Sequence, residues 1–228
     1  MTRKHRIGLL VVPANNTTME PEMNALCPDF APFLVARVAR PARTLVKDDL
    51  PAYRESTLAA IEPFLAEKPE LVVYGCTAAG FLAGRAGNAA MVGALRDRTG
   101  AEVVSTAEAM EQVLRHEGVT ETAVVTPYLP AVNEGLREAL GQAGIAVETL
   151  DSFLCETTAA LGRITEDQVR EKALATVTKD SRALFVACSQ LPTLRVVPAL
   201  RARLGIPVWS SIAATAWVAN RAMAREGT

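Results

Sequence analysis

Two cysteines in similar turn sequences are the residues of this chain best suited to covalent chemistry. Cys76 follows the apolar run 71–74, and Cys188 follows the similar run 183–187. Each run predicts a buried strand, and the residues after it predict a turn that opens a helix. The free N–H groups at a helix N-terminus favour a nearby anion, so a thiol placed there ionises more readily. We therefore predict two reactive thiols, each at a strand-to-helix turn.

Composition and charge exclude several classes of protein. Of the 228 residues, 50% are hydrophobic and 21% are charged, and the formal net charge is -1. The basic residues are scattered, which predicts no nucleic-acid partner. No apolar run approaches the ~20 residues of a membrane helix, and the run at 7–12 is too short for a secretory signal. We expect a cytoplasmic protein with no membrane partner and with reduced thiols.

The scarcity of histidine excludes other active-site classes. The chain has only two histidines, and its four cysteines show no C-x-x-C spacing. Ser–His–Asp and Cys–His hydrolase chemistry therefore lose their base, and we expect no metal site. No glycine-rich phosphate loop is present. Cys27 and Cys155 have no counterpart in a matching turn, and we interpret them as structural.

Strands alternate with helices along the whole chain, which predicts an α/β fold with a mostly parallel sheet. The expected strands are 7–12, 33–38, 71–74, 101–105, 121–126, 146–154, 183–187 and 207–209. The first expected helix begins near residue 19. The other expected helices cover 53–67, 88–98, 106–117, 131–143, 165–177, 194–204 and 211–224.

The spacing of the turns indicates a duplicated half. Cys76 and Cys188 lie 112 residues apart, and the same offset relates Asn16 to Tyr128. Ligands bind beyond the carboxyl ends of parallel strands. We expect Asn15, Asn16, Cys76, Tyr128 and Cys188 to lie at such strand ends. If the two halves face each other about a pseudo-twofold axis, the two thiols approach one ligand from opposite sides.

Three segments resemble the maleate cis-trans isomerases and, more broadly, the aspartate/glutamate racemase superfamily. They are residues 12–22 (VPANNTTMEPE), 126–128 (TPY) and 187–194 (ACSQLPTL). The superfamily also contains arylmalonate decarboxylases and amino-acid and hydantoin racemases. Because the decarboxylase branch keeps only the second cysteine, Cys76 argues against that branch.

The resemblance implies two Rossmann-like lobes with parallel sheets and an active site between them. The first lobe would comprise residues 1–100 plus 210–228, because the C-terminal helix crosses back to it, and the second would comprise residues 101–209. No cofactor is implied. A dimer or higher homo-oligomer is expected from size alone.

From the resemblance and the turn chemistry, we predict Cys76 and Cys188 as catalytic residues. The predicted substrate-binding residues are Pro13, Asn15, Asn16, Thr77, Ala78, Tyr128, Thr158, Ser189 and Gln190. Thr158 stands where isomerases of the family carry an Asn that helps to hold a substrate carboxylate.

Four functions remain open for a protein with this thiol pair and a small carboxylate ligand. In the first, Cys76 adds to the double bond of maleate while Cys188 protonates the adjacent carbon. In the second, the two thiols racemise an amino acid or hydantoin by moving a proton from one face to the other. The third is arylmalonate-type decarboxylation, and the fourth is a small-acid binding protein that has lost catalysis.

Overall fold

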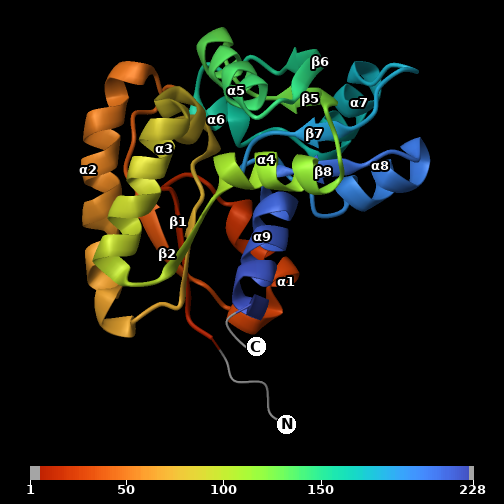
Figure 1. The fold of residues 1–228 in the computed structure, drawn as a ribbon. Coiled ribbons are helices and arrows are strands. Elements are labelled where there is room, and N and C mark those ends of the chain that lie inside the picture. The colour runs from red at the N-terminus through yellow and green to blue at the C-terminus, as the bar shows by residue number, and fades with distance from the viewer. Residues whose placement is uncertain (1–5, 226–228) are drawn as a thin grey trace.

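The chain forms two parallel four-stranded sheets with the same strand order (Figure 1). The computed structural model describes residues 6–225. The first sheet has the order β2-β1-β3-β4, with β1 Gly8–Pro13, β2 Leu34–Val38, β3 Leu71–Tyr74 and β4 Glu102–Ser105. The second has the order β6-β5-β7-β8, with β5 Glu121–Thr126, β6 Ala146–Ser152, β7 Leu184–Val186 and β8 Val208–Ser210. The predicted α/β class with two matching parallel sheets is confirmed.

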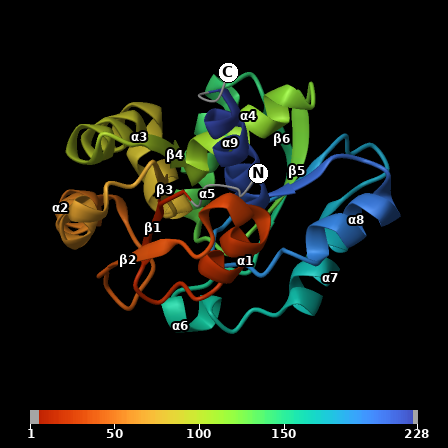
Figure 2. The same cartoon turned by 90° about the horizontal axis from the view of Figure 1, so that it is seen from below.

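Helices flank both sheets and fill the space between them (Figure 2). The α-helices are α1 Met19–Leu26, α2 Leu50–Ile61, α3 Thr77–Thr99, α4 Thr106–His116, α5 Pro130–Gln142, α6 Thr158–Leu161, α7 Glu166–Thr176, α8 Val196–Leu204 and α9 Ser211–Arg225. The 3-10 helices are η1 Pro28–Phe30, η2 Lys47–Asp49 and η3 Glu62–Glu67. Helices α4 and α9 pack on each other between the lobes, and α9 also contacts α1, β3 and β4.

The fourth strand corrects the predicted boundary between the lobes. β4 pairs in parallel with β3, with Val72 beside Val103, so it completes the first sheet. A second lobe beginning at residue 101 would remove this strand from its own sheet. Strand β8 ends the second sheet in the same way, because Val208 pairs with Leu184 of β7. Residues 100–106 (GAEVVST) and 205–211 (GIPVWSS), which are similar in sequence at an offset of 105, thus each contain the last strand of a sheet.

The helix after Cys76 is longer than the predicted helix 88–98. Helix α3 starts at Thr77 and continues to Thr99, with a break at Gly84, where φ is 67°. Glycine enters this left-handed region without a Cβ clash, which allows the helix to kink there. In contrast, the predicted helix 53–67 is shorter: α2 ends at Ile61, and the chain continues as the 3-10 helix η3.

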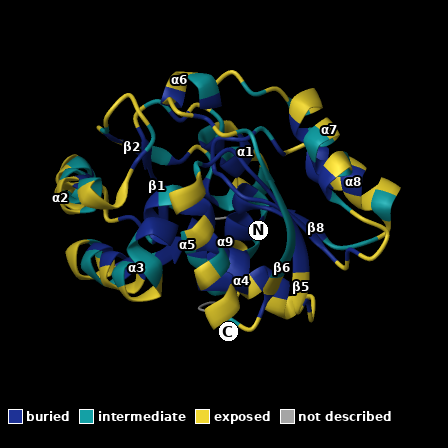
Figure 3. Cartoon of the chain, turned by 90° about the horizontal axis from the view of Figure 1, so that it is seen from above, coloured by how far each residue is buried: buried dark blue, intermediate teal, exposed yellow. Residues whose placement is uncertain are grey.

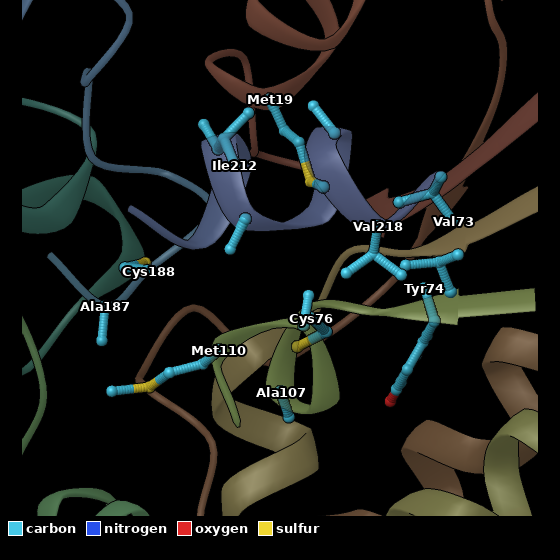
Figure 4. Close-up of a cluster of buried hydrophobic side chains, with 14 of the residues drawn as sticks. Met19, Val73, Tyr74, Cys76, Ala107, Met110, Ala187, Cys188, Ile212 and Val218 are labelled. Atoms are coloured by element: carbon cyan, nitrogen blue, oxygen red, sulfur yellow. The ribbon is translucent and has the colours of Figure 1, made fainter. Parts of the chain in front are cut away.

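The central strands are buried on both faces, as expected for a parallel sheet between helices (Figure 3). Figure 4 shows Cys76 and Cys188 in one cluster of buried side chains, together with Met110 of α4 and Ile212 of α9. None of the described helices combines the length and apolar character of a bilayer span. Within residues 6–225, no group of three or more His, Cys, Asp or Glu side chains is placed to hold a metal ion.

Candidate active site

Cys76 occupies the turn between β3 and α3, as the sequence predicts. It is the N-cap residue of α3. Its carbonyl accepts the first hydrogen bond of helical spacing, from the Gly80 N–H at 3.2 Å. Gly75 precedes it because the backbone passes close to β1 and α1. A Cβ at this position would lie 2.7 Å from both Met19 Sδ and Val12 Cγ1. The first thiol therefore lies at a helix N-terminus, held by a close contact that only glycine allows.

Cys188 follows β7 but does not lie at a helix N-terminus, so this part of the prediction was wrong. The Leu191 N–H donates to the Cys188 carbonyl at 3.4 Å, closing a turn, and α8 begins only at Val196. The segment between Cys188 and Val196 does not form a helix, and hydrogen bonds to another element hold it. The Thr193 N–H and hydroxyl both donate to the buried carboxylate of Glu22 on α1, at 2.7 and 2.9 Å.

The Cys188 thiol is held in its protonated form. Burial raises the pKa of Cys188 from 9.0 to about 11, against opposing contributions from the Gln190 N–H, Tyr128 and the positive charge of Arg40. The Gln190 N–H donates to Cys188 Sγ at 3.4 Å. The expectation of a readily ionised thiol is therefore contradicted at this position. At neutral pH this thiol can donate a proton.

Hydrogen bonds join the two cysteine turns across the lobes. Ser189 donates from Oγ to the Gly75 carbonyl at 2.6 Å, and Asn16 Nδ2 lies 3.2 Å from the Ser189 carbonyl and 3.1 Å from its hydroxyl. Asn16 Oδ1 accepts from the N–H groups of Thr18 and Met19, both at 3.1 Å, and so caps α1. Asn16 therefore links the second cysteine turn to the start of α1, in addition to reaching the cavity described next.

One cavity between the lobes contains both thiols. Nine of the predicted site residues line it: Pro13, Asn16, Cys76, Thr77, Ala78, Tyr128, Cys188, Ser189 and Gln190. The other lining residues are Arg40, Thr44, Leu45, Pro127, Leu129, Val132 and Leu161. The cavity volume is about 30 Å³, which accommodates roughly two water molecules.

Two predicted residues lie outside this lining. Asn15 contributes its carbonyl, which accepts from Gln190 Nε2 at 3.1 Å, and so supports the second cysteine turn. Thr158 begins α6, and its backbone N–H donates to the Ala42 carbonyl at 2.9 Å. In this structure neither side chain belongs to the cavity wall.

The Tyr128 hydroxyl is a buried donor without a hydrogen bond of normal geometry. Burial raises its pKa well above 10, and the neighbouring Cys188 thiol raises it further, while Thr77 lowers it. Tyr128 therefore stays protonated and can donate a hydrogen bond to an oxygen atom in the cavity.

One segment from each half closes the cavity. The loop after β2 pairs with the segment before α6: the Thr44 N–H donates to the Glu156 carbonyl at 3.0 Å, and Thr158 returns the bond to Ala42. Thr44 and Leu161, which line the cavity, come from these two segments. These two segments therefore form part of the cavity wall.

Two residues near the thiols were missed by the sequence analysis. Arg40 lines the cavity from a loop where a charged residue is ordinarily solvated. Tyr53 lies on α2, and its hydroxyl is buried near Cys76 without a hydrogen bond of normal geometry. Burial raises its pKa well above 10, the Cys76 thiol raises it further, and Arg40 lowers it. The sequence does give one indication that Arg40 lacks a local acidic partner, because no Asp or Glu lies between positions 38 and 46.

Larger hollows exist elsewhere on the molecule. One of about 480 Å³ lies between α3 and α4, and one of about 460 Å³ lies between α2 and α3. Neither is lined by a cysteine. We therefore take the smaller cavity between the lobes as the candidate active site, because it alone among these three brings reactive groups together.

The sequence profile described as arylmalonate decarboxylase matches residues 7–228. The chain belongs to this family. The maleate isomerase of Nocardia farcinica is 28% identical over 226 residues, which cover 96% of this chain and 90% of the isomerase. The arylmalonate decarboxylase of Bordetella bronchiseptica is 31% identical over 147 residues, or 64% of this chain and 61% of the relative.

Solved structures of the Nocardia farcinica isomerase share this fold. The form bound to TRIS has a TM-score of 0.87 at 27% identity, and the match covers 96% of this chain and 92% of the isomerase. A Cys-to-Ser variant of that isomerase, which contains a covalently bound succinylcysteine intermediate, has a TM-score of 0.85 at 27% identity with the same coverage. This chain is thus similar over nearly its whole length to a maleate isomerase and over about two thirds of it to an arylmalonate decarboxylase.

Proposed function

We propose that the protein is a cofactor-independent cis-trans isomerase of a small dicarboxylate, acting most like an enzyme that converts maleate to fumarate. One observation carries the proposal: cysteines from equivalent turns of the two halves line one cavity, in unlike surroundings. The succinylcysteine intermediate in the Nocardia farcinica isomerase supports the same chemistry.

The unlike surroundings of the thiols suit a division of roles. Cys76, as a thiolate at the N-terminus of α3, adds to one alkene carbon and forms a C–S bond. The electron pair of the double bond moves towards the adjoining carboxylate, and Cys188 gives its proton to the second carbon. Rotation about the resulting single bond follows. Cys188 then takes a proton back, the double bond re-forms, and the C–S bond breaks to release the trans product.

Donors around the cavity stabilise the charge that develops on the substrate. The backbone N–H groups of Thr77 and Ala78 lie in the first turn of α3, where no intrahelical acceptor exists for them. Tyr128 adds a buried hydroxyl beside Cys188 and Thr77 that forms no hydrogen bond of normal geometry. The Gln190 N–H, in contrast, already donates to Cys188 Sγ at 3.4 Å. Its first role is therefore to orient the acid.

Decarboxylation of a malonate is the second candidate, favoured by the family match and by the Bordetella bronchiseptica relative. In that reaction a carboxylate leaves as carbon dioxide, and a single thiol protonates the resulting carbanion. The second thiol, Cys76, is the residue that this scheme leaves without a role. We therefore rank isomerisation first.

The decisive experiment is proton NMR of the protein in heavy water with maleate, a malonate, aspartate or glutamate. We expect the maleate vinyl signal to be replaced by that of fumarate, with no reaction of the malonate. Deuterium entering the α position of an amino acid, with no action on maleate, would select racemisation. Release of carbon dioxide from the malonate alone would select decarboxylation.

A further inference from the structure

Arg40 is a positively charged residue of the cavity wall, and two of its guanidinium nitrogens have no hydrogen-bond partner. It lies in the loop after β2, and its Nε and Nη2 atoms are buried without a hydrogen-bond partner. Buried polar groups are normally hydrogen-bonded, and an unpaired guanidinium N–H is costly. The planar guanidinium fork matches a carboxylate, which accepts two parallel hydrogen bonds from it.

Neighbouring arginines of the same chain segment have acidic partners. Arg37 Nη2 lies 2.6 Å from Glu20 Oε2, and Arg43 Nη1 lies 2.7 Å from Asp49 Oδ2. Arg40 forms no ion pair within residues 6–225, and no acidic side chain lines the cavity that it faces. It is the one formally charged side chain among the lining residues. The cavity therefore has a net positive wall without a counter-ion from the protein.

The charge of Arg40 reaches the surroundings of both thiols. It acts directly on Cys188, where it opposes the effect of burial on the pKa. It also acts on Tyr53, whose own pKa is raised by burial and then by the Cys76 thiol. An anion bound by Arg40 would thus lie close to the reacting groups.

We propose that Arg40 binds the second carboxylate of a dicarboxylate substrate and makes the enzyme selective for dianions over monoanions. The inference rests on the proposed dicarboxylate function. The first carboxylate then faces Tyr128 and the N–H groups at the start of α3. Thr158 stands at the position predicted to hold a carboxylate, but it does not line the cavity. Arg40 does line the cavity, and in this proposal its N–H groups hold that carboxylate instead.

The test compares maleate with its monoamide, maleamate, in the wild-type protein and in three variants. Arg40→Leu removes the charge, Arg40→Lys keeps the charge without the fork, and Arg170→Leu is the matched control on the exposed surface of α7. We expect Arg40→Leu to lower kcat/KM for maleate by roughly 10- to 100-fold, as for loss of hydrogen bonds to a charged group, mainly through KM. The preference for maleate over maleamate should disappear, Arg40→Lys should be intermediate, and the control should match the wild type.

Thermal unfolding checks that Arg40→Leu folds, and we expect its Tm to equal or exceed that of the wild type because an unpaired charge is removed. Unchanged kcat/KM and an unchanged preference for maleate in a folded Arg40→Leu variant would overturn the inference and leave the isomerase proposal intact.

Calorimetry with succinate, which has no double bond to react, separates the two proposals. We expect the wild type to bind succinate more tightly than butyrate, and Arg40→Leu to bind both equally. This result would support the anion site even in a protein that fails to isomerise maleate. Equal binding of succinate by the wild type and Arg40→Leu would overturn it.

Discussion

The two cysteine turns occupy equivalent positions in the two halves and differ in almost every local detail. Cys76 follows Gly75 and starts the long helix α3 directly. Cys188 follows Ala187, and its turn runs on without a helix until Val196. The pKa of Cys188 is raised to about 11 by burial. Equivalent strands have thus placed two thiols at one cavity, while the turns after them create different electrostatic surroundings.

This difference shows how a duplicated fold can divide labour. Isomerisation by conjugate addition needs one sulfur as an anion and the other as a proton donor. A helix N-terminus favours the anion, and burial keeps the proton on Cys188. The assignment of Cys76 as nucleophile and Cys188 as proton donor can be tested by substitution, and replacement of the thiols themselves should have the largest effect.

Replacing either thiol should abolish turnover but leave different species behind. Cys76→Ser lacks the nucleophile, so we expect no adduct with maleate. Cys188→Ser keeps the nucleophile and should accumulate a covalent adduct at Cys76, visible by intact-protein mass spectrometry. In both variants kcat should fall by about three orders of magnitude or more, the size of effect seen when a catalytic triad member is removed. An adduct at Cys188 would reverse the assigned roles, and full activity in both variants would end the proposal.

Gly75→Ala tests whether the first turn depends on its close backbone contact. The added Cβ would meet Met19 Sδ and Val12 Cγ1 at 2.7 Å. Overpacking of this kind costs roughly 1–3 kcal/mol in the free energy of unfolding. We also expect lower activity because Cys76 is displaced. The comparison variant is Ala187→Gly at the equivalent position, where no overpacking arises and the cost is the backbone entropy of about 0.5–1 kcal/mol plus the loss of one buried methyl group of about 0.8 kcal/mol. Equal losses in the two variants would show that the turns are not distinguished in this way.

The buried thiol of Cys188 should make stability depend on alkaline pH. Its pKa is 9.0 when exposed and about 11 in the folded protein, so the folded state keeps a proton that the unfolded state releases. The stabilisation is complete below about pH 9 and is lost as the pH rises towards 11, with a slope of about 1.4 kcal/mol per pH unit. Urea unfolding under reducing conditions should show a shallower slope for Cys188→Ser. Cys27, raised to about 12, contributes equally to both proteins.

Ser189→Ala should cut the hydrogen bond that joins the two turns. The Ser189 hydroxyl donates to the Gly75 carbonyl at 2.6 Å. We expect a loss of about 1 kcal/mol in the free energy of unfolding, with reduced activity because the thiols lose their relative position. Thr165→Ala is the matched control: it removes the N-cap of α7 at a similar cost of about 1 kcal/mol and should leave activity unchanged. Equal activity in the two variants would contradict a positioning role for Ser189.

Much of the framework could be predicted from local patterns. Runs such as 71–74 are apolar throughout and end in small residues, a pattern typical of strands buried in a parallel sheet. The similar offsets between related turns indicated the duplication, and hence the meeting of Cys76 and Cys188 at one cavity. The length of α3 was missed because Gly84 and its small neighbours interrupt the helical pattern.

The rest depends on contacts between segments far apart in the chain. The turn after Cys188 avoids a helix because Thr193 bonds to Glu22, which is 171 residues away. Arg40 gives no periodic signal in the sequence, and its place in the cavity wall depends on the tertiary fold.

The amino-acid sequence by itself determined the strands, the duplicated alternation of strands and helices and the delivery of one thiol by each half. These features follow from hydrophobic periodicity and turn chemistry, which act over a few residues. Only the tertiary structure decided which thiol lies at a helix N-terminus, which one keeps its proton, and which cation faces them. Those properties arise from desolvation and electrostatic fields, and both depend on the atoms that the fold brings near from elsewhere in the chain.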